Sequence, residues 1–242
     1  MQRDKEYITK KITDKIDSLH DKKYIKPLLF IKENIDLYNE YELCYLIDNI
    51  DSCERTKFVP DLLRQVYIKT GILKDNENIF KGFISILKDN FDINSNIVEV
   101  GGGLFPTLGE MISAEQVDGT VTVYDPRLYK DDRTNPKLIL KKERFDENTD
   151  VTGADILVGF MPCEATEFLI RKACQNKKDF LVALCEGGHF DYDYDWFDEE
   201  AWRESMFYIA KRGIEDGKMG RFEKTDLKDY DDPYPVIFNK KL

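Results

Sequence analysis

Hydrophobic and polar positions follow two different patterns along the chain, and the change comes near residue 92. Before it, apolar residues recur at helical spacing, as at Ile8, Ile12 and Ile16. After it, short apolar runs are separated by glycine, proline and charged residues. The pattern predicts an N-terminal helical domain over residues 1–92 and a mixed α/β domain over residues 93–242. No glycine or serine linker separates them, so the boundary is one of composition.

The N-terminal helices have predicted start and stop signals. Lys26-Pro27 is expected to end or restart one helix, Pro60 to begin another, and Thr70-Gly71 to form a C-terminal cap. Two interpretations of these helices stay open. They form a core packed on itself and on the sheet, or they act as a lid that brings aromatic side chains to a substrate. The candidates for such a lid are Tyr38, Tyr41 and Tyr67.

The second part of the chain alternates strand and helix patterns, which is typical of a parallel sheet with crossover helices. Apolar runs predict five strands, over residues 97–100, 120–125, 137–145, 154–160 and 179–188. Helical patterns lie between or after them, over residues 107–115, 164–174 and 198–212. Two further strands, over residues 220–227 and 234–241, are expected to close the chain.

The stretch from Ile97 to Pro106, IVEVGGGLFP, predicts a ligand site. Without Cβ atoms, Gly101, Gly102 and Gly103 can turn sharply and let a bulky polar ligand approach the main chain. This turn follows a strand, and open α/β sheets bind ligands at the carboxyl ends of their strands. The next strand ends in Asp125, whose carboxylate can accept hydrogen bonds from the two hydroxyls of a ribose. A nucleotide-like ligand is therefore expected.

Pro106 separates two classes of cofactor. A dinucleotide site favours G-x-G-x-x-G, but Pro106 stands at the third glycine position and takes one donor away from a phosphate cradle. The pattern that matches is Glu99-x-Gly101-x-Gly103. It resembles the E/D-x-G-x-G hallmark of class I S-adenosylmethionine-dependent methyltransferases. A glycine-rich turn that holds some other ligand, or none, stays the alternative.

The resemblance implies a Rossmann-like, mostly parallel sheet with an antiparallel last strand, and S-adenosylmethionine as the cofactor. The glycine turn would lie against the methionine part of the cofactor, and Asp125 would hold the ribose. Glu99 would order the loop or reach the cofactor's amino group through water. Asp146 resembles the acidic residue that faces the adenine amino group. Phe160, the last residue of the fourth strand, is counted with the cofactor-binding residues because the transferred group points at that strand's end.

Residues after the fourth and fifth strands are candidates for the acceptor site. The segment Met161-Pro162-Cys163-Glu164 departs from the N/D-P-P-Y/F sequence of relatives that methylate amines of nucleobases or glutamine. Glu164 is a candidate general base, or else it favours the first turn of the next helix through the helix dipole. His189 is a candidate proton shuttle. The acidic, aromatic run over residues 191–196 suits a cationic small molecule, or forms a helix-capping loop.

Composition excludes several classes of function. A net charge of −11 argues against a large nucleic-acid footprint. The 5 cysteines form no C-x-x-C pair and the chain has 2 histidines, so no metal site is expected. No apolar run approaches the roughly 20 residues of a membrane span. The first residues lack the apolar region of a secretory signal, which makes the cytoplasm the expected location.

We therefore predict a methyltransferase that uses S-adenosylmethionine and acts on a small molecule, with amines as candidate acceptors. An aminocarboxypropyl transferase of the nicotianamine-synthase type is one alternative, because such enzymes also place a helical part before a similar core. A binding module that retains the cofactor and has lost its acceptor site is another. The sequence does not indicate the oligomeric state.

Overall fold

The structure is a computed structural model, and it describes residues 5–19, 22–38, 40–52, 62–63, 74–129, 135–185, 199–227 and 234–240. The chain forms two compact units, Met1–Ile79 and Phe80–Leu242. The division falls inside helix α5 (Lys74–Asn90), whereas composition places it after residue 92. The difference arises because the second half of α5 packs on the sheet: the Phe83 ring lies 5.7 Å from that of Phe160.

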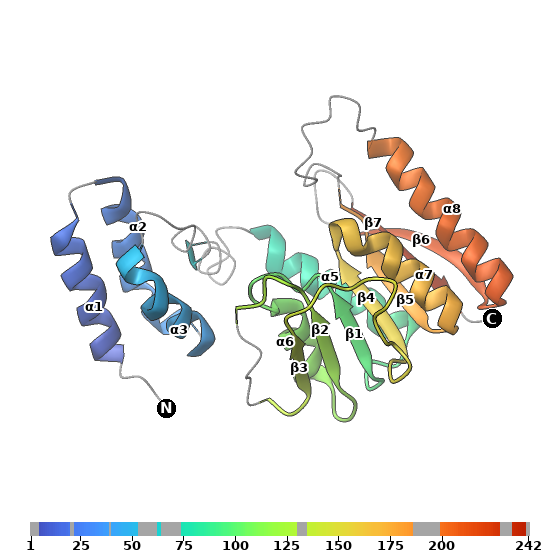
Figure 1. Ribbon diagram of the computed structural model, residues 1–242, viewed down its shortest axis with the longest axis horizontal. Coiled ribbons are helices and arrows are strands. Elements are labelled where there is room, and N and C mark those ends of the chain that lie inside the picture. Colours follow the sequence, from blue (N-terminus) through green and yellow to red (C-terminus); the bar gives the residue numbers. More distant parts are fainter. Residues whose placement is uncertain are drawn as a thin grey trace. The chain divides into compact units, whose positions relative to one another are not determined.

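The first unit is helical: its described residues include three α-helices and two 3₁₀ turns that precede α5 (Figure 1). They are α1 (Lys5–Ser18), α2 (Lys22–Glu33), η1 (Ile35–Leu37), α3 (Glu40–Asn49) and η2 (Ile50–Ser52). Ile8 and Ile12 of the predicted stripe are fully buried, together with Leu28, Ile31 and Leu46. The helical interpretation of this part of the sequence is confirmed.

One expectation for this unit is wrong. Pro27 lies inside α2 and neither ends nor restarts a helix, because the surrounding residues supply a packed helix that tolerates the loss of one backbone donor. Tyr38 is 5% exposed and its hydroxyl donates to the Leu62 carbonyl at 2.9 Å, so it packs inside this unit as the interpretation of a helical core expects. Pro60, Thr70-Gly71, Tyr67 and the side chain of Tyr41 lie outside the described residues.

The second unit is built on a seven-stranded sheet with the order β3-β2-β1-β4-β5-β7-β6. Its strands are β1 (Ile97–Val100), β2 (Val121–Tyr124), β3 (Leu138–Lys141), β4 (Ile156–Phe160), β5 (Asp179–Ala183), β6 (Arg221–Leu227) and β7 (Tyr234–Lys240). The first five are parallel, and β7 is antiparallel to both β5 and β6. The predicted Rossmann-like sheet with an antiparallel closing pair is confirmed.

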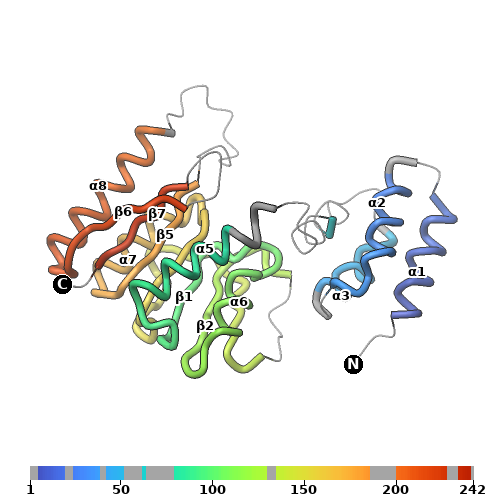
Figure 2. The backbone as a smooth tube through the Cα atoms, turned by 180° about the vertical axis from the view of Figure 1, so that it is seen from behind, coloured from blue at the N-terminus to red at the C-terminus, as the bar shows by residue number. Residues whose placement is uncertain are grey.

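Helices cover both faces of this sheet. Helices α7 (Thr166–Asn176) and α8 (Glu199–Gly217) pack on one face, where Val98 and Leu157 belong to the same buried cluster as Leu169 and Ala210 (Figure 1). The view from behind shows α5 and α6 (Thr107–Glu115) on the opposite face (Figure 2). Burial on both sides explains why β1, β4 and β5 are mostly apolar, with Glu99 of β1 itself buried.

Some boundaries differ from the sequence-based ones. The third strand covers only Leu138–Lys141, because residues 142–155 leave the sheet and form turns that return Phe145 and Val151 to the core. The helix after β4 starts at Thr166 behind a 3₁₀ turn, η3 (Cys163–Ala165), and α8 continues to Gly217. The fifth strand ends at Ala183. Residues 186–198 and 228–233 lie outside the described part.

The sheet topology determines where a site can form. Strand β1 pairs with β2 on one side and with β4 on the other, so the strand order reverses at β1: β2 and β3 are added on one side, and β4 and β5 on the other. Ligands of open α/β sheets bind at such a switch point, beyond the carboxyl ends of the strands. The segments that leave those ends here are the glycine turn after β1, Asp125 after β2 and Met161 after β4.

Candidate functional site

The glycine turn after β1 adopts a backbone that requires glycine at two positions. Gly101 has a φ of 82° and Gly103 a φ of 75°, a region that L side chains rarely adopt. The Gly101 N–H continues the sheet by donating to the Tyr124 carbonyl at 2.9 Å. A Cβ on Gly101 would lie 2.9 Å from the Pro162 Cα, whereas a Cβ on Gly103 would meet nothing within 4 Å. The turn is therefore closed at Gly101 and open at Gly103.

Glu99 lies underneath this turn, on the α6 face of the sheet. Its side chain is 2% exposed. A Cβ on Gly109 of α6 would lie 2.5 Å from Glu99 Oε2, and a Cβ on Gly102 would collide with the Val123 side chain. The two glycines thus let the backbone close over the carboxyl group, which holds the turn and the start of α6 together.

Burial changes the ionisation of this carboxyl group. Desolvation raises the pKa of Glu99 to about 8, a hydrogen bond from the Gly109 backbone opposes the rise, and repulsion from Asp125 adds to it. The Oε2 atom has no hydrogen-bond partner among the described residues. Glu99 is therefore mostly protonated at neutral pH, and it acts as a structural group beneath the loop.

Asp125 leaves β2 beside the turn and is hydrogen-bonded on both carboxylate oxygens. Oδ2 accepts from the Gly103 N–H at 2.8 Å and from Arg127 Nη2 at 3.1 Å. Oδ1 accepts from the Arg127 backbone N–H at 2.7 Å and from Arg127 Nε at 3.2 Å. A further bond, from the Tyr129 N–H to the Leu104 carbonyl at 3.1 Å, joins the two loops. The segment after β2 and the glycine turn therefore form one connected structure.

The segment after β4 has an unusual backbone. Met161 and Cys163 have φ angles of 51° and 49°, on either side of Pro162, which lies against Gly101. Non-glycine residues in this conformation are strained, and such strain is concentrated at functional sites. A thiol–thiol hydrogen bond with Cys185, together with burial, raises the pKa of Cys163. The thiol is therefore a poor nucleophile at neutral pH.

The remaining predicted site residues are placed as follows. Phe160 packs its ring edge-on against Phe80 and Phe83 of α5, at centroid distances of 5.0 and 5.7 Å. Glu164 lies in η3 and is exposed to solvent. Asp146 does not directly follow a strand, since β3 ends at Lys141; its Oδ1 accepts from the Asn148 N–H at 2.8 Å within a turn. His189 lies outside the described residues.

The structure thus brings together the glycine turn, Glu99, Asp125 and the segment after β4. Sequence reasoning did not identify Gly109 or Arg127. A glycine inside a helix destabilises it by about 1 kcal/mol relative to alanine, so Gly109 carried a usable signal of close approach. Arg127 carried none, because an arginine after a β-strand is ordinary and only the fold shows where it points.

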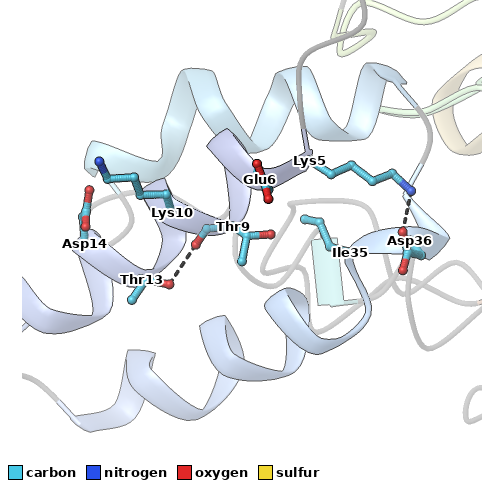
Figure 3. Close-up of a pocket in the computed structure, with 8 residues that line it drawn as sticks. All are labelled: Lys5, Glu6, Thr9, Lys10, Thr13, Asp14, Ile35 and Asp36. Atoms are coloured by element: carbon cyan, nitrogen blue, oxygen red, sulfur yellow. Dashed lines mark hydrogen bonds and ion pairs between the residues drawn. The ribbon is translucent and has the colours of Figure 1, made fainter.

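Two other hollows lie away from this site. A shallow cleft on the first unit is lined by polar side chains of α1, with Ile35 and Asp36 of η1, and the Lys5–Asp36 ion pair of 2.6 Å spans it (Figure 3). Both partners are exposed, at 50% and 82%, so the cleft is a solvated helix surface. A groove of about 150 Å³ follows β1 and β2 next to residues 150–154. Its lining includes Asn96 and Thr120, at the amino ends of these strands.

The described part of the chain holds neither a cluster of metal ligands nor a membrane-spanning helix. Across the described ranges, no three His, Cys, Asp or Glu side chains gather as a metal ion would require. No described helix combines the length and the apolar character needed to cross a bilayer.

The chain was compared with known proteins. No protein-family model matches it, and no curated protein matches it in sequence. It is similar to the solved structure of the S-adenosylmethionine-dependent methyltransferase SibL, with 10% identity, coverage of 97% of this chain and 74% of that one, and a TM-score of 0.49.

Two further structures are similar over a smaller part of the chain. Precorrin-6y C5,15-methyltransferase from Geobacter metallireducens is 11% identical over 67% of this chain and 87% of its own, with a TM-score of 0.45. Aeropyrum pernix fibrillarin with natively bound S-adenosyl-L-methionine is 11% identical over 66% and 75%, with a TM-score of 0.43. Identities this low assign no function to the chain.

Proposed function

We propose that this protein binds S-adenosylmethionine at the carboxyl ends of β1 and β2 and transfers its methyl group to a small molecule. The observation that carries the proposal is the pairing of an open glycine turn with a buried carboxylate on the next strand. Gly103 has free space above it, and its N–H bonds to Asp125 at 2.8 Å. A ligand that contacts both must fill the open space at Gly103 and offer hydrogen-bond donors to the carboxylate. An amino acid derivative that carries a ribose does both.

The residues present fit this cofactor in three respects. Gly103 has no side chain, and nothing else lies within 4 Å of the position that a Cβ would take, so a ligand can approach the backbone there. The Asp125 carboxylate lies at the end of β2, within reach of two vicinal hydroxyls bound at the turn. The Glu99 carboxyl group, held beneath Gly102 and Gly109, fixes the shape of the turn without placing a charge in it at neutral pH.

Methyl transfer asks little of the chain beyond positioning. Bound S-adenosylmethionine supplies a methyl group that its sulfonium already makes electrophilic. The protein must hold an acceptor in line with it and accept a proton where the acceptor loses one. Glu164 is the described residue best suited to that second task, because its exposed carboxylate lies two residues from Pro162, which contacts the glycine turn. His189 and the acidic run over residues 191–196 remain the sequence-based candidates for acceptor contacts.

The proposal is tested by calorimetry with S-adenosylhomocysteine and NADH, followed by product analysis. We expect S-adenosylhomocysteine to bind and NADH to give no signal. Incubation with S-adenosylmethionine and a panel of amines and hydroxylated acids should then release S-adenosylhomocysteine. Release of methylthioadenosine would indicate aminocarboxypropyl transfer, and binding without any product a non-catalytic module. Binding of NADH alone would overturn the proposal.

A further inference from the structure

Arg127 covers the carboxylate that is expected to hold the cofactor. Its guanidinium donates to both oxygens of Asp125, from Nε at 3.2 Å and from Nη2 at 3.1 Å. The Asp125 side chain is 3% exposed, whereas that of Arg127 is 73% exposed. The carboxylate is thus screened from solvent by a side chain that itself lies mostly in water.

The hydrogen-bonding capacity of Asp125 is filled. An ionised carboxylate offers about four acceptor positions on its two oxygens. Here they receive two backbone N–H groups, of Gly103 and Arg127, and two guanidinium N–H groups of Arg127. Two ribose hydroxyls need two of these positions, so two of the present donors must leave before a ribose can bind.

Only the guanidinium donors can leave at small cost. The Gly103 N–H is part of the glycine turn, and the Arg127 N–H is held in a turn in which the Leu128 N–H also bonds to the Asp125 carbonyl at 3.2 Å. Moving either would break the loop that joins β2 to the glycine turn. The Arg127 side chain is 73% exposed and can swing into water without breaking a backbone hydrogen bond. The Asp125 carboxylate that it leaves is buried, so the exchange requires that the incoming hydroxyls replace the lost donors.

We propose that the Arg127 guanidinium occupies the ribose positions of Asp125 in the free protein and is exchanged for the two ribose hydroxyls on binding. Arg127 therefore sets the affinity of the site for ligands that carry a vicinal diol, and it weakens that affinity. The inference rests on the proposed function, because it takes Asp125 as the ribose acceptor.

The exchange is tested by calorimetry of the full chain with S-adenosylhomocysteine. Arg127→Met keeps the length of the side chain and removes its donors. We expect it to bind about two- to fivefold more tightly than the parent, because the ligand no longer has to displace the guanidinium from the carboxylate. Arg127→Lys, which keeps the charge but not the two-pronged geometry, should fall between them. Arg171→Met is the control: it makes the same substitution at another exposed arginine, which pairs with Glu167 on α7, and it should bind as the parent does.

Ionic strength separates exchange from a general effect on folding. Salt screens this half-exposed ion pair only in part, so the parent's affinity should rise modestly with ionic strength toward that of Arg127→Met, whose affinity should change little. Equal or weaker binding by Arg127→Met, in a parent that does bind S-adenosylhomocysteine, would overturn the inference and leave the proposed function standing. Absence of binding in both proteins would overturn the proposed function and the inference with it.

Discussion

Gly101 and Pro162 approach so closely that a Cβ atom added to Gly101 would lie 2.9 Å from the Pro162 Cα. The contact joins the turn after β1 to the segment after β4, the two strands that flank the switch point of the sheet. Pro162 itself is held between two residues with positive φ, so it has little freedom to withdraw. The geometry of the site thus depends on the absence of a single side-chain carbon.

Replacement of Gly101 by alanine should therefore destabilise the protein and disrupt the site. Alanine at a φ of 82° costs about 1–2 kcal/mol before the clash with Pro162 is counted. We expect a loss of roughly 2 kcal/mol or more in the free energy of unfolding, measured by urea denaturation. Gly153→Ala is the control, because a Cβ there would meet nothing within 4 Å and its φ is ordinary. Equal stabilities for the two variants would contradict the observed contact.

Gly103→Ala distinguishes an effect on ligand binding from an effect on stability. It also has positive φ, but a Cβ there would meet nothing within 4 Å. We expect a stability loss of only about 1 kcal/mol, from backbone strain alone. Binding of S-adenosylhomocysteine should fall by at least tenfold, since the added carbon occupies the space above the turn. Retention of full affinity would show that the ligand does not contact Gly103.

The sequence predicted the sheet well because its signals are local. The run from Ile97 to Val100, the glycine turn and the helix from Thr107 each follow from backbone preference and burial, and all three are found. The third strand was predicted too long. Residues 142–145 carry polar and apolar side chains in a mixture that suits an edge strand, but residues 142–155 turn back over the sheet to bury Phe145 and Val151.

Contacts between distant residues were beyond the reach of the sequence pattern. Pro27 was predicted to end a helix because proline usually does so. The sequence pattern does not show the packing that keeps α2 continuous across this residue. The burial of Tyr38 could not be predicted either, because it depends on a contact with Leu62, which lies 24 residues further along the chain. The glycines and Asp125 were found as a motif, but the occupancy of Asp125 by Arg127 depends on side-chain directions that only the fold determines.

Asp125→Asn tests the ribose assignment directly. The substitution keeps the shape of the side chain and removes its charge, so charge-assisted hydrogen bonds to a ligand are lost. We expect affinity for S-adenosylhomocysteine to fall about ten- to hundredfold, corresponding to about 1–3 kcal/mol. The control is Asp155→Asn, before the amino end of the central strand β4, where the carboxylate accepts the Asn96 N–H at 3.0 Å. If both variants bind as the parent does, Asp125 does not hold the ligand.

Glu99→Gln should change how stability depends on pH. The folded-state pKa of Glu99 is about 8, above its ordinary value of 4.5, so between these values the folded protein holds a proton that the unfolded chain releases. The contribution of Glu99 to stability is therefore fully present below pH 4.5. It is lost as pH rises toward 8, with a slope that approaches about 1.4 kcal/mol per pH unit. Glutamine stays neutral and removes this slope.

The measurement is urea denaturation of parent and variant at several values between pH 5 and pH 9. The stability of Glu99→Gln relative to the parent should increase steadily up to about pH 8 and then level off, because the parent is fully ionised above that point. Glu115→Gln is the control, since this exposed carboxylate on α6 pairs with Lys88 in solvent. A constant difference between parent and Glu99→Gln across the range would mean that the buried carboxyl group keeps its ordinary pKa. Glu99 would then carry a negative charge beneath the glycine turn at neutral pH.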